Sequence, residues 1–450
     1  MLHEVVKIQI KVYFMPILNS PVKMPARFFE VNKELILCMF CVSIVLAHNA
    51  FALKETALGR FDLSASLSAE YDSRVFGISS QSLQKVIISG ESDDRIAVNE
   101  IESEDDLIIR FTPAVHYSKK LRWFTFSGSA GVQLAQFVKN DKKSYVQPIS
   151  TFSIDFDETL SKKKRISNNA KIRFDMTFDL GQKVEASVLE QDLVSYSYFL
   201  IGSNVRYNHS SKFGVGAGTS YSYRNYQAGV TGGQSNAPYN DLAIIPIYAR
   251  AFYIYSEKLD FFTEYNYSRS RDMSGGGGSN LTDGATHGVN FGAQGELSPK
   301  LSGNAKIGFV RQIYDAGFTG QSTISLGSGL QWTLNRKTSM GFDLNRGFSP
   351  SAQGYTMLNT TGRLSLNHRF TDDVSGTAYV SYGTTDYTYA SGTSSSLRSN
   401  SLDNIGFGAT VTKTLSKHFT TSGGYSFSHL ARESESYGRH LVRVDLNGRF

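Results

Sequence analysis

Charged residues recur at every second position in several segments of the chain, between apolar residues. Between positions 170 and 180, Lys171, Arg173, Asp175 and Asp179 alternate with apolar side chains. Because successive side chains of a β-strand point to opposite faces of a sheet, such a segment has one charged face and one apolar face. Rows of fixed charges could line a water-filled path for a solute, or they could pair across strands and only stabilise the sheet.

The candidates for a polar lining share this alternation and carry both signs. They are Arg110, Lys171, Arg173, Asp175, Asp179, Arg206, Glu264, Arg363, Arg443 and Asp445. For any one of these residues, cross-strand pairing is the alternative to contact with a solute. Because both signs are well represented, we expect a polar channel without strong charge selectivity.

Patterns for catalysis or metal binding are weak. The histidines after residue 52 are scattered, and none lies in a nucleophile motif. Acidic residues gather in segment 73–105, but their spacing matches no calcium-binding loop, so we interpret the segment as a solvated acidic loop. The alternating glycines between 214 and 218 are interpreted as small strand residues, because no helix follows them to bind a phosphate. We expect no enzymatic activity, no cofactor and no metal.

The N-terminus has the pattern of a secretory signal peptide. An apolar run over 33–46 follows Arg27 and precedes Ala50-Phe51-Ala52, a small-x-small cleavage site. The sequence therefore predicts a signal peptide over 1–52, with cleavage after Ala52, and one domain over 53–450. An uncleaved anchor is the alternative, but the run is shorter than the roughly 20 apolar residues of a membrane-spanning helix. Met15 or Met24 could be the true initiator.

Two further global features exclude other classes of protein. Both cysteines, Cys38 and Cys41, lie inside the predicted signal peptide, which excludes a disulfide scaffold and a cysteine metal site in the remaining chain. Without residues 1–52 the chain has 41 basic and 37 acidic residues, and this net charge near +4 is too small to indicate a nucleic-acid partner.

Period-two alternation is the dominant signal after residue 52. Apolar or small residues at Phe61, Leu63, Leu67 and Tyr71 alternate with polar ones, and the same pattern returns along the chain up to its last residues. We expect about eighteen strands of about ten residues, or sixteen as the alternative, and no amphipathic helix.

The connections alternate between two kinds. Short polar turns are expected at 118–120, 160–167, 210–212, 256–258, 298–300, 335–338, 371–373 and 415–418. Longer loops rich in Gly, Ser, Asn and Asp are expected at 73–105, 138–147, 181–195, 225–241, 270–286, 312–321, 347–355, 384–401 and 430–438.

Short turns on one rim, long loops on the other and alternating strands are typical of a transmembrane β-barrel. In hydrocarbon every backbone N–H and C=O must be hydrogen-bonded, and a sheet achieves this only by closing on itself. The sequence thus predicts an all-β fold, a closed antiparallel transmembrane barrel with short periplasmic turns and long extracellular loops. A soluble β-sandwich is the alternative, but its strands average only about five to six residues.

Tyrosines cluster near the ends of the expected strands, at Tyr221, Tyr223, Tyr226, Tyr253, Tyr255, Tyr265, Tyr267, Tyr382, Tyr387 and Tyr389. We interpret them as an aromatic girdle at the membrane interfaces. Stacking against sugar rings in the lumen is the alternative.

The last strand has an apolar face formed by Val442, Val444 and Leu446 and ends on Phe450. This pattern resembles the signal that the outer-membrane assembly machinery recognises in Gram-negative bacteria. The segments 67–76 and 105–113 are similar to the openings of the putative β-barrel porin 2 family, although Arg74 stands where Asn usually follows Asp-Ser. The resemblance implies a cell outer membrane location and an association with exopolysaccharide production.

The function expected from these observations is a porin-like channel, either for passive diffusion of hydrophilic solutes or for export of a polysaccharide. The expected partners are outer-membrane lipid, the barrel-assembly machinery and the transported polysaccharide or small solutes. A phospholipase-like outer-membrane hydrolase is one alternative, and a surface adhesin or structural barrel with a plugged lumen is another.

Overall fold

The computed structural model describes residues 59–77, 80, 102–121, 124–156, 171–187, 192–226, 239–274, 281–315, 317–352, 354–388, 401–432 and 436–450. These residues belong to one compact unit, Leu46–Phe450. The predicted signal peptide over 1–52, with its two cysteines, lies outside the described residues, as do most of 73–105 and Tyr389.

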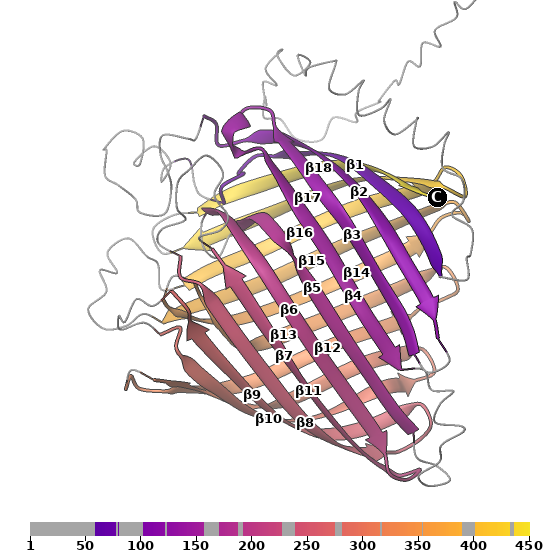
Figure 1. Cartoon of the computed structure of the whole chain (residues 1–450), viewed down its shortest axis with the longest axis vertical. Coiled ribbons are helices and arrows are strands. Elements are labelled where there is room, and N and C mark those ends of the chain that lie inside the picture. Colours follow the sequence, from indigo (N-terminus) through magenta and orange to yellow (C-terminus); the bar gives the residue numbers. More distant parts are fainter. Residues whose placement is uncertain are drawn as a thin grey trace, which may run out of the picture. The chain divides into compact units, whose positions relative to one another are not determined.

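The described chain is almost entirely β-strand (Figure 1). Its strands are β1 (Arg60–Asp72), β2 (Asp106–Lys120), β3 (Phe124–Phe137), β4 (Tyr145–Phe156), β5 (Lys171–Ser187), β6 (Asp192–Asn208), β7 (Phe213–Asn225), β8 (Leu242–Ile254), β9 (Leu259–Asp272), β10 (Gly284–Ser298), β11 (Leu301–Tyr314), β12 (Gln321–Thr333), β13 (Thr338–Pro350), β14 (Thr356–Arg369), β15 (Val374–Thr388), β16 (Ser401–Thr414), β17 (Phe419–Arg432) and β18 (Ser436–Arg449). A single 3₁₀ turn, η2 (Asp141–Lys143), lies among the described connections.

The described part of the chain contains no helix that is both long and apolar enough to cross a membrane.

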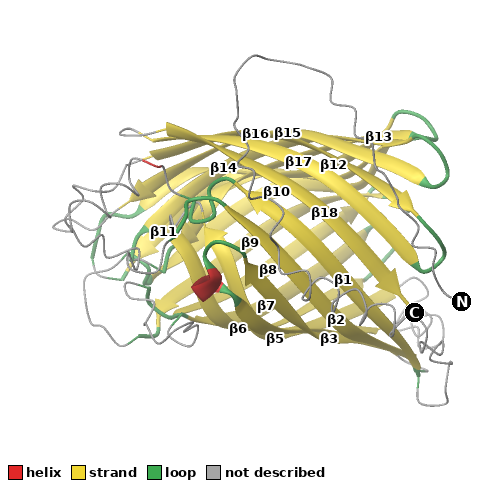
Figure 2. Cartoon of the chain, turned by 90° about the horizontal axis from the view of Figure 1, so that it is seen from above, coloured by secondary structure: helices red, strands yellow, loops and turns green. Residues whose placement is uncertain are grey.

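The strands form one antiparallel sheet that closes on itself. Each strand pairs with the next in the sequence, and β1 also pairs with β18 from Asp72↔Leu441 to Ser64↔Arg449. The seam ends at Phe450, which exchanges two backbone hydrogen bonds with Leu63, of 2.8 and 3.0 Å. Figure 2 shows the resulting continuous wall of strands. The predictions of an all-β fold, a closed barrel and about eighteen strands are confirmed.

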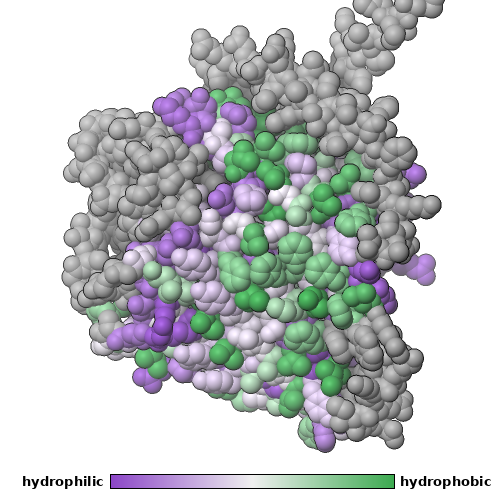
Figure 3. Space-filling view, in the orientation of Figure 1, coloured by the Kyte–Doolittle hydropathy of each residue, from purple (hydrophilic) through white to green (hydrophobic). Residues whose placement is uncertain are grey.

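The register keeps one face of every strand apolar around the wall. Residues directly opposite each other in neighbouring strands share a face. One such row runs Ala378, Ala409, Tyr425, Val442, Tyr71. The large side chains of this face are exposed, for example Phe309 at 73% and Val380 at 55%. Apolar side chains accordingly gather across the visible outer wall (Figure 3). This is the face that meets lipid in a membrane-spanning barrel.

Aromatic side chains form a continuous outer row over β1 to β7. Their ring centroids are 4.8–6.3 Å apart, and the row runs Phe61, Tyr117, Phe126, Phe152, Phe178, Phe199, Tyr221. Of the girdle candidates, Tyr253, Tyr265 and Tyr382 are exposed on the outer face. Tyr226 and Tyr387 are instead buried.

Several predicted loop and strand bounds were wrong. The segment 181–195 is mostly strand, since β5 ends at Ser187 and β6 begins at Asp192, and 430–438 shrinks to 433–435. The strands have 12–17 residues rather than about ten. The ends of β5 and β6 remain paired as far as Ser187↔Asp192, because cross-strand hydrogen bonding does not require regular alternation of apolar side chains. The connection predicted at 160–167 spans 157–170, outside the described residues.

Adjacent residues of β16 test which face meets lipid. Ala409 lies on the apolar face and Thr410 on the opposite face, where it pairs with Thr377. Ala409→Arg places a charge in the middle of the outer wall and should destabilise the folded barrel by about 2–4 kcal/mol. Thr410→Arg should cost much less, because its charge can stay hydrated. Urea unfolding in lipid vesicles, followed by tryptophan fluorescence, measures both; equal losses would contradict the assignment of faces.

Candidate functional site

The predicted lumen residues share the face opposite the apolar one. The register places Arg443 opposite Glu70, Arg363 opposite Asp343, and Arg173 opposite Arg206. Lys171 pairs with Asn208 through its backbone on the same face, but its side chain lies outside the described set. This polar interior face is the candidate functional site.

One group of interior charges lies at the seam between β1, β2 and β18. The Arg110 guanidinium lies 3.0 Å from the Glu70 carboxylate, and Arg443 lies 3.7 Å from the same carboxylate. Arg443 also donates to Asp445 at 2.7 Å. Three of the predicted residues are therefore brought together around Glu70 in alternating sign.

A second group is built around Glu264 on β9, which is only 1% exposed. Its carboxylate is paired with Arg250 of β8 and, at 2.9 Å, with Lys306 of β11, and it accepts a 2.7 Å hydrogen bond from Asn266. Lys306 reaches across β10 beside Gly292, where an added Cβ would lie 3.0 Å from Lys306 Cβ. A buried carboxylate needs such compensation, because an unpaired buried charge is costly.

Arg206 connects strands that are not neighbours. Its guanidinium lies 2.8 Å from the Asp260 carboxylate, although Arg206 is on β6 and Asp260 on β9. On the way it lies over the ring of Phe252, 4.2 Å from the centroid. Gly216, opposite Arg206 on β7, leaves this path open, since an added Cβ would lie 3.0 Å from that ring. The strand glycines thus make room for interior side chains.

The remaining predicted residues each contact a different neighbouring side chain and do not join either group. Asp175 accepts a 2.8 Å hydrogen bond from Asn204, and Asp179 accepts one from Thr151. Arg363 lies over the ring of Tyr379, 3.8 Å from its centroid. The structure therefore distributes these charges along the interior wall in locally compensated groups and does not gather them at one catalytic centre.

Sequence reasoning missed Arg250 and Lys306, which complete the Glu264 group. Strand β8 reads LAIIPIYARAFYI and is apolar on both faces over most of its length, so the alternation disappears there. In β11, Lys306 is flanked by Ala305 and Ile307 and stands alone among apolar and small residues. If the alternation of inward and outward side chains in β9 had been extended to its neighbouring strands, both cations would have been assigned to the interior face.

The loop end of the interior is lined by packed apolar side chains. Val75 and Phe76, just after β1, are 1% and 2% exposed and pack against Ile108 and Phe137 on the inner face. A similar cluster extends over β14 to β18 and consists of Tyr355, Met357, Tyr387, Leu402, Leu430 and Tyr437. The charged middle of the barrel is therefore bounded at this end by an apolar collar.

At the same end of the barrel, connections that are far apart in the sequence are joined by backbone hydrogen bonds. The segment 351–355, between β13 and β14, accepts hydrogen bonds from the backbone of Asn240 at 2.8 Å and of Leu281 at 3.0 Å. Ala352 in this segment is 1% exposed and belongs to a cluster with Tyr196. The collar is thus fixed by contacts between connections as well as by the strands.

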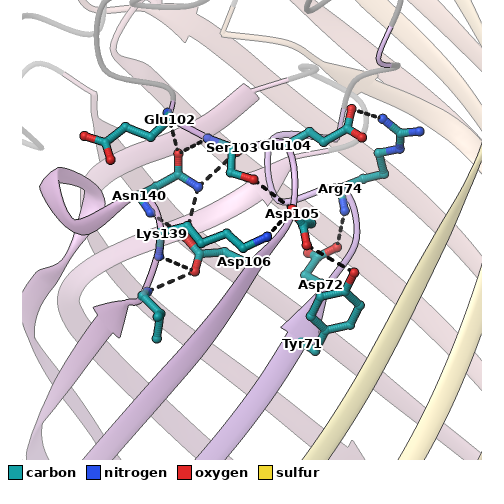
Figure 4. A network of polar contacts seen from close by, with 11 residues as sticks. Tyr71, Asp72, Arg74, Glu102, Ser103, Glu104, Asp105, Asp106, Lys139 and Asn140 are labelled. Atoms are coloured by element: carbon teal, nitrogen blue, oxygen red, sulfur yellow. Dashed lines mark hydrogen bonds and ion pairs between the residues drawn. The ribbon is translucent and has the colours of Figure 1, made fainter. Parts of the chain in front are cut away.

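Asp106, at the start of β2, organises the described part of the first long loop (Figure 4). It is fully buried and accepts four hydrogen bonds of 2.8–2.9 Å. Three come from the backbone N–H groups of 138–140 and one from the Asn140 side chain. Asn140 in turn accepts hydrogen bonds from the backbone of Glu102 and Ser103. One carboxylate therefore ties the first long connection to the second.

Asp72, at the end of β1, closes the seam at the same rim. It accepts a hydrogen bond from the backbone of Arg74 at 2.9 Å and another from Arg439 Nε of β18 at 3.0 Å. Arg74 also forms an ion pair with Glu104. Residues 67–76 and 105–113, which carried the family resemblance, thus contain the polar anchors of this rim.

A polar cavity of about 380 Å³ lies just inside the collar. Its lining includes Arg110, Tyr145, Gln147, Lys183, Tyr198 and Arg439. Charges, amides and aromatic rings meet here on one wall, so the cavity offers both hydrogen-bonding groups and flat apolar surfaces to a hydrophilic molecule.

Catalytic geometry is incomplete in the described residues. Ser64 Oγ and His116 Nε2 are 2.8 Å apart on the interior face. No described carboxylate hydrogen-bonds to the His116 ring, whereas an activated nucleophile needs a base that a third group orients. The described residues also contain no cluster of three or more His, Cys, Asp or Glu side chains that could hold a metal ion.

Asp106→Asn should loosen both connections at this rim. An amide replaces one acceptor oxygen with a donor that faces backbone N–H groups, so at least one buried group loses its partner, at a cost of about 1–3 kcal/mol. Limited proteolysis of the folded barrel in detergent should show faster cleavage near 102–105 and 138–144. Asp141→Asn, at an exposed position of the same connection, is the control; equal cleavage of the two variants would contradict the role of Asp106.

The rim should also respond to acid through Asp105. Burial raises the pKa of Asp105, but hydrogen bonds from Lys139 and Ser103 outweigh it and hold the pKa below its ordinary value of 3.8. Its stabilising contribution is therefore complete above pH 3.8 and is lost as the pH falls through the lowered pKa of the folded state. Hydrogen-exchange protection factors at 138–144 should drop below about pH 4 and go on dropping towards about pH 2. Asp105→Asn should remove most of this drop; a wild-type protein with constant protection would refute the link.

Comparison with known proteins agrees with this architecture. The family model described as "Putative beta-barrel porin 2" matches residues 156–450. The segments 67–76 and 105–113 precede the matched range. A search of curated proteins gives no match.

Among solved structures, the chain is similar to OccK1 (OpdK) of Pseudomonas aeruginosa, with 9% identity, a TM-score of 0.45, and coverage of 87% of this chain and 98% of that chain. It is similar to OccAB4 of Acinetobacter baumannii, with 11% identity, a TM-score of 0.43, and coverage of 88% and 99%. It is also similar to the FrpB iron transporter of Neisseria meningitidis (F3-3 variant), with 9% identity, a TM-score of 0.41, and coverage of 86% and 81%.

The family match covers well over half of the chain and agrees with the closed antiparallel sheet of eighteen strands. This chain is an outer-membrane barrel and belongs to the putative β-barrel porin 2 family.

Proposed function

We propose that the barrel is a passive channel for small hydrophilic solutes. The observation that carries this proposal is the interior wall, where charges of both signs lie in compensated groups inside a closed sheet of eighteen strands. Barrels of about 16–18 strands are wide enough to leave an aqueous channel. A hydrated wall of paired charges lets polar molecules pass without binding them tightly and without strongly selecting one sign.

The apolar collar and the polar cavity beside it would act as the narrow part of the path. A solute entering from the loop end meets Val75 and Phe76 before it reaches the charges around Glu70. This order, with the apolar collar before the charged wall, favours molecules that can lose part of their hydration shell. The collar would set the size limit, and the charged middle would keep the path hydrated.

Polysaccharide export is the second candidate, and interior tyrosines favour it. Tyr145 and Tyr198 line the polar cavity, and Tyr379 lies under Arg363. Aromatic faces beside amides and charges suit sugar rings, which present both apolar faces and hydroxyl groups. A non-enzymatic role is consistent with the porin family, whereas a plugged adhesin would lack conductance.

We also propose that the terminal strand is read by the barrel-assembly machinery. Val442 and Val444 are 44% and 55% exposed on the outer face of β18, and Phe450 packs its ring at 5.5 Å from that of Phe419. These side chains are accessible on the face that a membrane-embedded receptor would meet.

Single-channel recording in planar bilayers tests the channel. Large, stable and weakly selective steps are expected. Arg363→Glu should shift the reversal potential towards cation selectivity, because it reverses a charge that faces the interior. The control is Lys413→Glu, a charge reversal on the outer face of β16. It should leave the reversal potential nearly unchanged.

Oligosaccharides added to the same bilayer separate the two candidates. Reversible blockade by neutral oligosaccharides would favour polysaccharide passage, and unaffected currents would favour small solutes. Correctly folded protein that never conducts would overturn both candidates and support a plugged barrel.

A further inference from the structure

The outer wall carries a hollow over β7 to β13. Its volume is about 780 Å³, and its rims include Phe213, Tyr253, Phe261, Phe291, Ile307 and Leu344. All six side chains belong to the apolar outer face. The hollow therefore opens on the lipid-facing surface, although Phe252, Phe262 and Lys306, which belong to the inner face, also border it.

The register explains why the wall is hollow here. One cross-strand row runs Phe261, Ala293, Ala305, Ser328 and Leu344, so three small side chains lie between two large ones. The parallel row above it, Phe291, Ile307 and Leu326, is large throughout. The adjoining part of the wall, β1 to β7, carries the continuous aromatic row instead. The row of small side chains and the large side chains around it thus form a local groove, which does not continue around the barrel.

Lysines lie at the short-turn end of this groove. Lys212 immediately precedes Phe213, and the carbonyl of Lys212 accepts a 2.7 Å hydrogen bond from Ile254, next to Tyr253. Lys258 and Lys300 lie in the turns before β9 and β11, two of the strands that form the groove. All three side chains are exposed. Lys258 Nζ lies 2.8 Å from the Glu296 carboxylate, which offsets part of one charge.

The groove is apolar along its length and has exposed lysines at one end. This arrangement is complementary to an anionic phospholipid, which has apolar acyl chains and a negatively charged headgroup. Acyl chains fit the apolar hollow, and lipid phosphates at its end would lie near Lys212, Lys258 and Lys300, which belong to three successive short turns roughly 10 Å apart. A lysine near an anionic headgroup attracts it electrostatically, whereas a neutral lipid with the same chains gains no such attraction. A second copy of the barrel would fill the hollow with protein but would not use the lysines.

We propose that this groove binds an anionic phospholipid, with its acyl chains in the hollow over β7 to β13 and its phosphate at the lysines of the short turns. The site orders one or a few lipid molecules of the phospholipid leaflet, in preference to neutral lipids with the same chains. The proposal does not depend on whether the barrel conducts.

Native mass spectrometry of the full mature barrel tests the proposal directly. The protein is reconstituted with equal amounts of phosphatidylglycerol and phosphatidylcholine carrying identical acyl chains, then released from detergent in the gas phase. Wild-type protein should retain phosphatidylglycerol in clear excess. No preference between the two lipids would overturn the proposal.

Two sets of variants assign the retained lipid to the groove. Ala293→Phe with Ala305→Phe fills the hollow, and Lys212→Gln with Lys258→Gln and Lys300→Gln removes the charges. The lysine set should reduce phosphatidylglycerol retention by at least about tenfold. The set that fills the hollow should also reduce it, because the acyl chains lose their site. The matched controls are Ala409→Phe on the outer face of β16, and Lys119→Gln with Lys413→Gln and Lys417→Gln near other short turns. A heat-dependent gel shift confirms that each variant folds before it is compared.

The other occupants give distinct results. Equal losses in the control variants would mean a general lipid annulus and would refute the site. Retention of lipopolysaccharide over phosphatidylglycerol, or a dimer that Ala293→Phe dissociates in the absence of lipid, would refute the proposed occupant.

Discussion

A barrel in hydrocarbon has to hydrogen-bond every backbone N–H and C=O group within its own sheet. In this protein that requirement is met by pairing β1 with β18, which leaves no free strand edge in the described sheet. The rest of the structure follows from the closure. Once the register is fixed at the seam, every strand has one face towards lipid and one towards the interior, because a shift by one residue would reverse both faces.

The interior face is stabilised by compensation and not by apolar packing alone. Glu264 is buried but is surrounded by two cations and by amides, and Arg206 reaches an acidic partner across two intervening strands. Gly216 on β7 and Gly292 on β10 supply the space. The same groups that stabilise the wall therefore give it a polar surface, so structural pairing and a polar lining are two descriptions of one arrangement.

The alternation of side chains was enough to predict the barrel and the number of its strands, because a membrane imposes period two on nearly every strand. It failed where both faces have the same polarity. In β8 the interior positions are mostly apolar, which hid Arg250. At the paired ends of β5 and β6, single apolar residues such as Val184 and Val194 stand among glutamine, glutamate and aspartate, which made paired strand look like loop. Contacts between distant connections, such as Ala352 with the segment around Asn240, leave no local pattern and could not be predicted.

The seam also constrains the order of assembly. Asp72 and Arg439 are separated by 367 positions in the sequence, and Asp72 has only 2% of its surface exposed. Until the last strand arrives, the anchor at the end of the first strand lacks its guanidinium partner, and contacts between residues so far apart form slowly. The described residues around Asp72 can therefore reach their final arrangement only after β18 has paired with β1, so the order of this rim reports that the barrel has closed.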